Sequence, residues 1–479
     1  MPKETITPRA ADYSQWYLDI VRAADLSENS GVRGCMIIKP YGFAIWELVR
    51  DALDARIKAT GHVNAYFPLL IPMSYLTKEA EHVAGFAPEA WEVTRGGGEP
   101  LPETYVIRPT SETIIGEAFS RWIKSWRDLP MLVNQWANVM RWEMRTRPFL
   151  RTSEFLWQEG HTAHVTEEEA ERETLMVLND VYAETVENVM ALPVLKGMKT
   201  EKEKFAGAVR TYTIEAMMQD GKALQSGTSH NLGQNFARSF DMKYLSSANT
   251  EEYCWTTSWG VSTRLIGALI MAHSDDEGLV LPPAVAPIQV VIVPLWRSDA
   301  EREQTVAAAR RLGGDAGNRF RWHVDDRENL SPGFKYNEWE VKGVPVRVEL
   351  GPRDLASGSV MVARRDLPGR DGKQPFPLET ATERIEALLT DIQASIYKRA
   401  LDFRTSHTFE VETLSEFSDA IESGFAACWF DGDSGAEDEI QTRWKATVRL
   451  LPLEPPQGQG ACFYTGRRTT RRAVFARSY

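Results

Sequence analysis

The chain has 479 residues, of which 43% are hydrophobic and 25% are charged, the composition of an ordinary folded protein with roughly two to four domains. No stretch approaches the ~20 continuous apolar residues of a membrane helix, and residues 1–20 lack the apolar segment of a signal peptide, so no membrane association is expected. The formal net charge of −12 argues by itself against nucleic-acid binding, but arginines crowd residues 467–477, so local basic surfaces can exist.

The N-terminal half contains three predicted helices and one predicted buried strand. Apolar residues recur at helical spacing over residues 44–59 and 113–126, and a third, longer helix is predicted over 167–190. The proline-containing apolar run 66–72 predicts a buried strand after the first helix. The three glycines at 96–98 predict a loop, without a phosphate-binding role, because the strand and helix that such loops join are missing.

The pattern changes after a proline-rich segment, residues 281–287, which predicts a linker. A β-rich run at 289–293, a helical run at 300–312 and a second β-rich run at 320–324 predict a small α/β domain with a βαβ connection. A last long helix, predicted over 378–401, leads into a polar, glycine-containing C-terminal region.

Two runs of alternating character, 135–143 and 151–161, predict a pair of antiparallel strands. Period two then places polar and aromatic residues on one face: Gln135, Arg141, Glu143, Arg151, Phe155, Trp157, Glu159 and His161. Such a face is poor as a core and good as a pocket. Arg145 and Arg147 in the connecting segment suit phosphates. A solvated hairpin with Arg–Glu surface pairs is the alternative interpretation.

Three segments in order resemble the motifs of class II aminoacyl-tRNA synthetases. The first helix and the segment ending at Pro68 resemble motif 1, the dimer-interface element. Residues 140–143 with 151–155 resemble motif 2, and residues 258–267 resemble motif 3. Three motifs in this order are much more specific than any one of them.

Further segments narrow the resemblance to the prolyl-tRNA synthetase family, and within it to the archaeal/eukaryotic-type branch. They are RPTSET at 108–113, FLWQEGH at 155–161, KTEKEKFAG at 199–207 and GTSHNLGQ at 227–234. The resemblance covers essentially the whole chain. A synthetase-like paralogue without catalysis and another enzyme of subclass IIa are the alternatives.

The resemblance implies an α/β multidomain fold. Residues 1–283 would form a catalytic domain with an antiparallel β-sheet flanked by helices. Residues 284–395 would form an α/β anticodon-binding domain, and residues 396–479 a small α+β C-terminal domain.

The implied reaction activates L-proline with ATP to prolyl-adenylate, releasing pyrophosphate, and transfers proline to the 3′ end of tRNA(Pro), releasing AMP. The partners would be ATP, Mg²⁺, L-proline, tRNA(Pro) and a second copy of the chain, bound through motif 1.

The residues that the resemblance assigns to ATP are Arg141, Glu143, Arg151, Phe155, Gln225, Thr228 and Arg264. Phe155 would stack on adenine. Arg141 and Arg264 are the candidate catalytic residues, because phosphoryl transfer needs charge placed where the transition state develops it. Motif 3 has Thr263 where many class II enzymes have glutamate, which leaves Glu143 and Gln225 as candidate magnesium ligands.

The residues that the resemblance assigns to proline are Thr110, Glu112, Arg141, Phe155, Trp157, Glu159, His161 and His230. A secondary ammonium needs a hydrogen-bond acceptor and a counter-charge, and a pyrrolidine ring needs flat apolar walls. Seen without the resemblance, Thr110 or Ser111 would cap the following helix, with Glu112 favoured by the helix dipole. His230 would equally be a structural histidine.

Segments within 331–354 resemble the anticodon-binding domain of this subclass. Glu340, Arg347 and Arg353 are the candidate readers of the proline anticodon, because arginine pairs bidentately with guanine and glutamate accepts from base amino groups. A solvated charged rim is the alternative for each residue.

Relatives often hold a zinc ion in the last domain through four cysteines. Here Cys428 and Cys462 match two ligand positions, while Asp433 and Thr465 stand at the other two. Threonine is not a usual zinc ligand, so no structural zinc is predicted. The four cysteines of the chain form no C-x-x-C pair, which favours a reducing, cytoplasmic setting over a disulfide framework.

About sixty residues separate His161 from Gln225, too few for a typical editing domain, so no editing in cis is predicted. The resemblance also implies that the terminal residue, Tyr479, reaches toward the active site.

Overall fold

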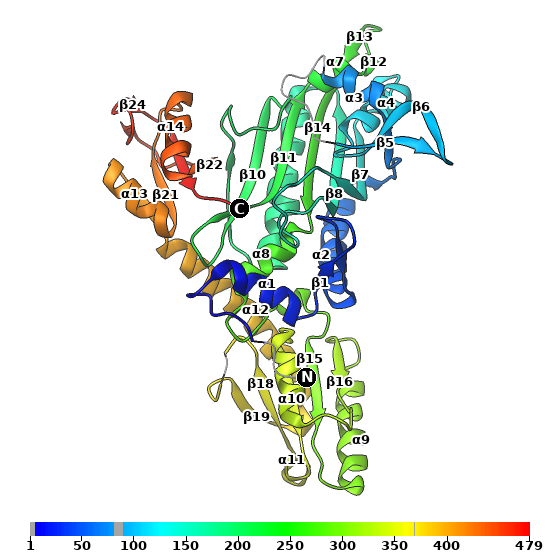
Figure 1. Cartoon of the computed structure of the whole chain (residues 1–479), viewed down its shortest axis with the longest axis vertical. Coiled ribbons are helices and arrows are strands. Elements are labelled where there is room, and N and C mark those ends of the chain that lie inside the picture. The colour runs from blue at the N-terminus through cyan, green and yellow to red at the C-terminus, as the bar shows by residue number, and fades with distance from the viewer. Residues whose placement is uncertain (1–4, 81–89, 368) are drawn as a thin grey trace.

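The computed structural model describes residues 5–80, 90–367 and 369–479. Figure 1 shows an N-terminal part, blue to green, built around a large β-sheet, with a yellow-green part containing a smaller sheet below it. The orange and red C-terminal part lies beside the large sheet. Within the described ranges, every helix falls short of the length and apolar character that a bilayer crossing requires.

The large sheet contains eleven strands in the order β20-β21-β25-β22-β9-β10-β11-β14-β8-β7-β3. Seven come from the N-terminal part: β3 (Val63–Asn64), β7 (Met131–Met140), β8 (Glu154–His164), β9 (Val194–Met198), β10 (Arg210–Met217), β11 (Ala223–Gly233) and β14 (Trp255–Ser262). Neighbours from β7 to β9 are antiparallel, and β3 joins β7 in parallel. The predicted antiparallel sheet is confirmed.

Helices cover this sheet and close its core. They are α1 (Tyr13–Ala23), α2 (Pro40–Ala59), α5 (Glu167–Met176), a π-helix (Val177–Ala183), α6 (Glu184–Asn188) and α8 (Arg264–His273). Leu53 of α2, Tyr182 of the π-helix and Leu269 of α8 are buried in one cluster with Ile214 of β10. Helices from distant parts of the chain therefore stabilise the sheet by burying one shared apolar core.

Two predicted elements at the N-terminal side differ in extent. The helix predicted over 44–59 begins earlier, at Pro40, because the fixed φ of proline suits the first turn of a helix. The buried strand predicted over 66–72 is wrong in extent. Only β4 (Leu70–Pro72) is a strand there, and it pairs with β6 (Glu99–Ile107) in a separate three-stranded sheet with β5 (Trp91–Gly96).

The other two predicted helices are interrupted. The helix predicted over 113–126 ends earlier, as α4 (Glu112–Trp122), because a capping box at Ser125 starts a separate 3₁₀ turn, Trp126–Asp128. The stretch predicted over 167–190 is helical from Glu167 to Asn188, with the π-helix in its middle.

The smaller sheet has the order β16-β15-β17-β18-β19. Its elements are β15 (Val290–Pro294), α9 (Asp299–Ala316), β16 (Trp322–Val324), α10 (Pro332–Val341), β17 (Val346–Leu350), α11 (Pro352–Ser357), β18 (Ser359–Arg364), β19 (Lys373–Pro377) and α12 (Ala381–Ser406). β15 is parallel to both β16 and β17, which confirms the predicted βαβ connections. The predicted linker at 281–287 is largely buried against the rest of the chain.

The C-terminal part extends the large sheet. It contains β20 (Thr408–Val411), α13 (Leu414–Ser423), β21 (Phe425–Trp429), α14 (Ser434–Trp444), β22 (Thr447–Pro452) and β25 (Arg472–Ala476). β22 pairs with β9 through Leu451–Met198 and Pro452–Gly197, so one sheet runs through both parts. The predicted domain boundary after residue 395 falls within α12, a continuous helix.

Candidate active site

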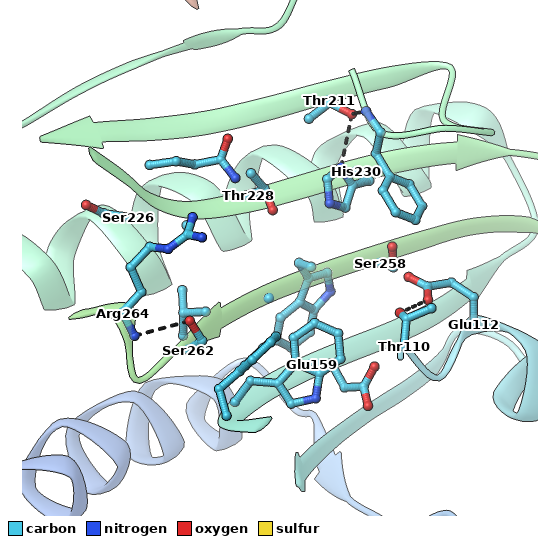
Figure 2. Close-up of a pocket in the computed structure, with 18 of the residues that line it drawn as sticks. Thr110, Glu112, Glu159, Thr211, Ser226, Thr228, His230, Ser258, Ser262 and Arg264 are labelled. Atoms are coloured by element: carbon cyan, nitrogen blue, oxygen red, sulfur yellow. Dashed lines mark hydrogen bonds between the residues drawn. The ribbon is translucent and has the colours of Figure 1, made fainter. Parts of the chain in front are cut away.

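A cavity of about 320 Å³ opens on the large sheet between β8, β11 and β14 (Figure 2). The predicted ATP and proline residues that line it are Thr110, Glu112, Arg141, Phe155, Trp157, Glu159, His161, Gln225, Thr228, His230 and Arg264. Figure 2 shows Arg264 at one end of the cavity and Thr110, Glu112 and His230 toward the other. The structure thus brings together every predicted ligand-binding residue of the N-terminal part except Glu143 and Arg151.

The strands β7 and β8 pair antiparallel as predicted, and Gln135, Ala137 and Val139 lie opposite Glu159, Trp157 and Phe155, respectively. Both predicted strands extend too far into the connecting segment, because β7 ends at Met140 and β8 begins only at Glu154. The period-two argument therefore does not extend to the residues beyond these ends.

Arg141 still reaches the cavity from just beyond β7. Its backbone N–H donates to the carbonyl of Ser153 at 2.8 Å, and its Nε donates to the carbonyl of Pro109 at 2.9 Å. The guanidinium lies 5.4 Å from the ring centre of Phe155 and 5.5 Å from that of Trp157. One backbone carbonyl and two aromatic rings thus fix the direction of this cation, while the bond to Ser153 holds the backbone that carries it.

Glu143 and Arg151 lie outside the cavity and pair with each other at 3.4 Å. Arg151 is exposed on the protein surface. For these two residues the surface ion pair, which was the alternative interpretation of the hairpin, describes the structure.

Arg264 is the first residue of α8, and its Nε donates to the carbonyl of Leu150 at 3.2 Å. Loss of water around the guanidinium lowers the pKa of Arg264 to about 10, and repulsion from Arg141 and Arg151 adds to this effect. The pKa of Arg141 is also lowered, by the surrounding protein first of all, although the residue stays accessible through the cavity. Arg141 and Arg264 both line the cavity and repel each other, so an anion bound between them would relieve this repulsion.

Glu159 lies at the centre of a buried hydrogen-bond network. Its Oε1 accepts from Ser111 Oγ at 2.5 Å and from Gln135 Nε2 at 2.8 Å, and its Oε2 lies 3.1 Å from His161 Nε2. Burial opposes the charge on this carboxyl, but the hydrogen bonds outweigh it and hold the pKa of Glu159 below its usual value. Burial likewise opposes the charge on His161, yet the contact with Glu159 raises the pKa of His161.

The start of α4 supplies the next two residues of the cavity. The hydroxyl of Thr110 donates to the carboxylate of Glu112, the first residue of α4. Ser111 holds the N-cap position, but its side chain makes no capping hydrogen bond and donates to Glu159 instead. The alternative in which Ser111 caps the helix is therefore wrong.

His230 faces the same cavity from β11. Its Nδ1 lies 3.0 Å from Thr211 Oγ1, and its ring centre lies 4.7 Å from that of Phe205. Loss of water lowers the pKa of His230 to about 3, so this imidazole is neutral at physiological pH. A neutral ring beside Phe205 forms a flat, largely apolar wall.

Sequence reasoning missed several residues of the cavity. They are Glu203, Phe205, Thr211, Ser226, Ser258 and Ser262. Glu203 and Phe205 belong to the segment 199–207, which carried part of the family resemblance, and that was the signal that could have found them.

The three candidate anticodon residues lie in two environments. Arg347 of β17 is buried, bonded to Glu340 at 2.6 Å and Glu349 at 3.1 Å, with the Tyr336 ring 4.2 Å away. Glu340 is half exposed at the C-terminal end of α10. Arg353 is exposed in the first turn of α11. Glu340 and Arg353 are therefore accessible to a partner, whereas Arg347 positions Glu340.

The degenerate zinc positions make other contacts. Cys428 is buried, with its Sγ 3.7 Å from the carbonyl oxygen of Ala473. Asp433 caps α14 and pairs with Arg467. The other two positions, Cys462 and Thr465, both contact Asp431. Within the described residues no cluster of three or more His, Cys, Asp or Glu side chains could hold a metal ion.

Tyr479 lies against the start of β11. Its backbone N–H donates to the carbonyl of Ala223 at 3.2 Å, and its hydroxyl donates to Asp220. The guanidinium of Arg147, in the segment between β7 and β8, lies 5.9 Å from its ring centre. The chain terminus thus contacts the segment that resembles the motif 2 loop.

Three protein-family models match segments of the chain. Residues 97–273 match the model "tRNA synthetase class II core domain (G, H, P, S and T)", residues 289–388 match "Anticodon binding domain", and residues 414–479 match "Prolyl-tRNA synthetase, C-terminal".

Curated relatives match over the whole length. Proteins named "Proline--tRNA ligase" from Roseiflexus sp. (strain RS-1) and Chloroflexus aurantiacus are 64% and 63% identical, each over 100% of both chains. One from Prosthecochloris aestuarii is 55% identical over 99% of this chain and 100% of its own. From its class II core, its C-terminal domain and these full-length bacterial relatives, we conclude that the chain belongs to the prolyl-tRNA synthetase family.

Proposed function

We propose that the chain is a proline–tRNA ligase, which activates L-proline with ATP and transfers it to the 3′ end of tRNA(Pro). One observation carries the chemistry: Arg141 and Arg264 face a single cavity, and among the described residues neither guanidinium has a carboxylate at ion-pair distance. The opposite end of that cavity offers carboxylates and hydroxyls. A ligand with anionic phosphates at one end and an ammonium at the other fits this division of charge.

At the phosphate end, Arg264 holds the outer phosphates, while Gln225 and Thr228 contact the nucleotide. Arg151 would join Arg264 by exchanging its surface ion pair with Glu143 for the phosphates. Phe155 supplies a face for adenine stacking. Gln225 and Glu143 would contact the Mg²⁺ that accompanies ATP, and the ion would neutralise phosphate charge. Glu143 would then exchange its ion pair with Arg151 for this contact. Magnesium usually keeps several waters and takes only one or two protein ligands beside the phosphates.

At the proline end, the imino group lies beside the carboxylate of Glu112 and the hydroxyl of Thr110. The walls for the ring are Trp157 and the neutral His230, with Glu159 and His161 behind them. A charged imidazole at His230 would repel the secondary ammonium, and the low pKa of this histidine prevents that.

Arg141 stands between the two ends and binds both reacting groups. One oxygen of the proline carboxylate attacks the α-phosphorus of ATP, and the bond to the bridging oxygen breaks, so pyrophosphate leaves with its electron pair. The guanidinium stabilises the charge that develops on the α-phosphate oxygens. A ribose hydroxyl at the tRNA 3′ end then attacks the carbonyl carbon, and AMP leaves.

The remaining assignments are part of the same proposal. We propose the domain divisions 1–283, 284–395 and 396–479, with the last boundary inside the continuous helix α12. For anticodon reading, Glu340 and Arg353 are accessible, and the buried Arg347 acts through its ion pair with Glu340. Pairing of two copies through motif 1 is supported by the exposed edge strand β3, where Val63 is 62% exposed. Four free, buried cysteines favour a reducing, cytoplasmic setting.

Three finer points also remain proposals. The archaeal/eukaryotic-type branch is supported by the short segment between β8 and β11. That segment holds only a helical stretch, a loop, β9 and β10, which supports the absence of editing in cis. The structural zinc is proposed to be absent, because Asp431, Asp433, Cys462, Thr465 and Arg467 contact one another in the same place.

ATP–pyrophosphate exchange, screened across the amino acids, tests this function. Exchange with proline is expected, with weaker exchange for alanine and cysteine, because a pocket that reads ring size gains only ~1–3 kcal/mol per methylene. Stronger exchange with threonine or another amino acid would identify a different subclass IIa enzyme. A folded protein without any exchange would indicate the non-catalytic paralogue.

A further inference from the structure

The loop between β9 and β10, residues 199–209, forms one wall of the cavity. Glu203 and Phe205 line it. The ring of Phe205 lies 4.7 Å from His230, and its backbone N–H donates to Thr211 Oγ1 at 3.0 Å. This wall belongs to the end of the cavity where Figure 2 places His230 and Thr211, opposite Arg264.

The C-terminal part holds the other side of the same loop. Thr200 Oγ1 donates to Glu437 Oε2 of α14 at 3.0 Å, and only 7% and 6% of these two residues are exposed. Lys202 Nζ donates to Asp438 at 2.6 Å and to Gln441 at 2.9 Å, both also on α14. Successive loop residues therefore face helix α14, while Glu203 and Phe205 face the cavity.

The base of the loop is fixed by a buried ionic cluster. Lys199 Nζ donates to Glu215 Oε1 and to the carbonyl of Arg449, both at 2.7 Å, and the Arg449 guanidinium pairs with the same glutamate at 3.1 Å. Arg449 belongs to β22, the strand that joins the C-terminal part to β9. The two cations share the buried carboxylate of Glu215, and Lys199 also donates to a backbone carbonyl, so the base of the loop is tied to β10 and β22.

We propose that α14 is a positioning element for proline binding, and that Glu437 is its principal residue. It touches no substrate; it holds Thr200, and the loop that begins there places Phe205 and Glu203 against the proline. The buried Thr200–Glu437 hydrogen bond carries more of this effect than the Lys202–Asp438 pair, because Asp438 is 71% exposed and solvent weakens its attraction. This inference rests on the proposed proline specificity of the cavity.

Variants of Glu437 in the full-length enzyme test the proposal through separate KM values in ATP–pyrophosphate exchange. Glu437→Ala is expected to raise the KM for proline about tenfold, while the KM for ATP changes less than about twofold. Glu437→Gln should restore the proline KM, because its amide oxygen still accepts from Thr200. The matched control is Glu439→Ala on the same helix, whose carboxylate accepts from Tyr464 and lies outside the cavity; it should behave like wild type.

Two further measurements separate positioning from folding and from the proposed function. Thr200→Val removes the donor of the same hydrogen bond. Adding this change to Glu437→Ala should therefore raise the proline KM little further. If Glu437→Ala does not fold, Thr200→Val alone tests the proposal. Trypsin should cut Glu437→Ala faster than wild type after Lys202 or Lys204, whatever amino acid the enzyme uses. If wild type shows no proline-dependent exchange, the proposed function fails and the cleavage rates alone decide this inference.

Two results would overturn the role of α14. One is a folded Glu437→Ala enzyme with wild-type proline KM and wild-type cleavage. The other is an equal rise in the KM values for proline and ATP, since a general loosening of the catalytic domain would not distinguish the two ends of the cavity.

Discussion

The guanidinium of Arg365 donates two hydrogen bonds, at 2.6 and 2.7 Å, to the carboxylate of Asp275, across the contact between the smaller sheet and the catalytic core. Its Nε also donates to the carbonyl of Glu340 at 2.9 Å. Arg365 is almost completely buried, and Asp275 lies two residues beyond the end of α8, the helix that begins at Arg264. A single side chain therefore links α10, which contains Glu340, to the segment that follows α8, which begins at Arg264.

Arg365→Met is expected to lower the free energy of unfolding by about 2–3 kcal/mol, because it leaves the largely buried Asp275 carboxylate without its partner. Scanning calorimetry should then resolve separate transitions for the two parts. The control is Arg364→Met, whose partners Asp366 and Asp391 belong to its own domain. A single transition with an unchanged midpoint in Arg365→Met would contradict the expected coupling.

Arg141→Ala and Arg264→Ala should keep the fold and lower proline-dependent ATP–pyrophosphate exchange by about a hundredfold or more, since one preorganised charge contact contributes roughly 3 kcal/mol to the transition state. Circular dichroism checks the fold, and radiolabelled pyrophosphate checks the rate. Arg310→Ala, which changes an exposed arginine of α9 outside the cavity lining, is the matched control. Near-normal exchange in either folded variant would remove that arginine from the mechanism.

The stability of the chain should fall as the pH drops from 6.5 to 4. Burial lowers the pKa of His273 to about 4 and that of His164 to about 4, whereas an unfolded histidine titrates near 6.5. In that window the unfolded state binds more protons, so protonation favours unfolding by about 1.4 kcal/mol per pH unit for each histidine.

Urea denaturation at several pH values checks this sign. His273→Gln can still donate to the carbonyl of Met190, which His273 contacts at 3.0 Å. Its free energy of unfolding should depend less steeply on pH, by the contribution of one proton. Parallel curves for the variant and the wild type would show that His273 does not contribute.

Arg353→Ala should raise the KM for tRNA(Pro) in aminoacylation roughly tenfold or more while leaving ATP–pyrophosphate exchange unchanged, because a bidentate arginine–guanine contact contributes ~1–3 kcal/mol. The residue is exposed on α11, so the fold does not depend on it. Arg311→Ala, at an exposed arginine of α9, controls for loss of surface charge. If both changes raise the KM for tRNA(Pro) equally, Arg353 belongs to a solvated charged surface and does not read the anticodon.

Alanyl-tRNA(Pro) incubated with the purified enzyme should be hydrolysed no faster than in buffer. The chain between β8 and β11 folds into elements of the catalytic sheet and its covering helices, which leaves no separate module for a second hydrolytic site. Release of labelled alanine measures the rate. Hydrolysis that depends on enzyme concentration would place an editing activity elsewhere in the chain.

The hairpin of β7 and β8 could be predicted because alternation is a local property, visible in 135–140 and 154–161 without any knowledge of the fold. Its ends could not. Arg141 and Arg151 continue the alternation in sequence, but the backbone of Arg141 turns toward Ser153, and Arg151 pairs with Glu143 at the surface. Alternation places Arg141 on the same face as Phe155 and Trp157, and its guanidinium does lie beside both rings, although the strand itself ends at Met140.

Residues whose roles depend on distant partners escaped prediction. Thr110 or Ser111 is predicted to cap α4, and Ser111 does hold the N-cap position, yet its hydroxyl donates to Glu159, forty-eight positions along the chain. Phe205 belongs to a loop without periodicity, and only the tertiary fold brings its ring to His230. The pairing of β22 with β9 joins Leu451 to Met198, and no local pattern predicts so distant a contact.

That pairing limits how the chain can be shortened. A fragment that ends after α12 would leave β9 with one row of backbone N–H and C=O groups facing water, beside the apolar side chains of Val194 and Leu195. Unprotected sheet edges recruit strands from other molecules, so such a fragment is expected to aggregate rather than to serve as a minimal catalytic unit. Engineering of a smaller enzyme would therefore begin by replacing β22 with another edge strand or with charged residues on β9.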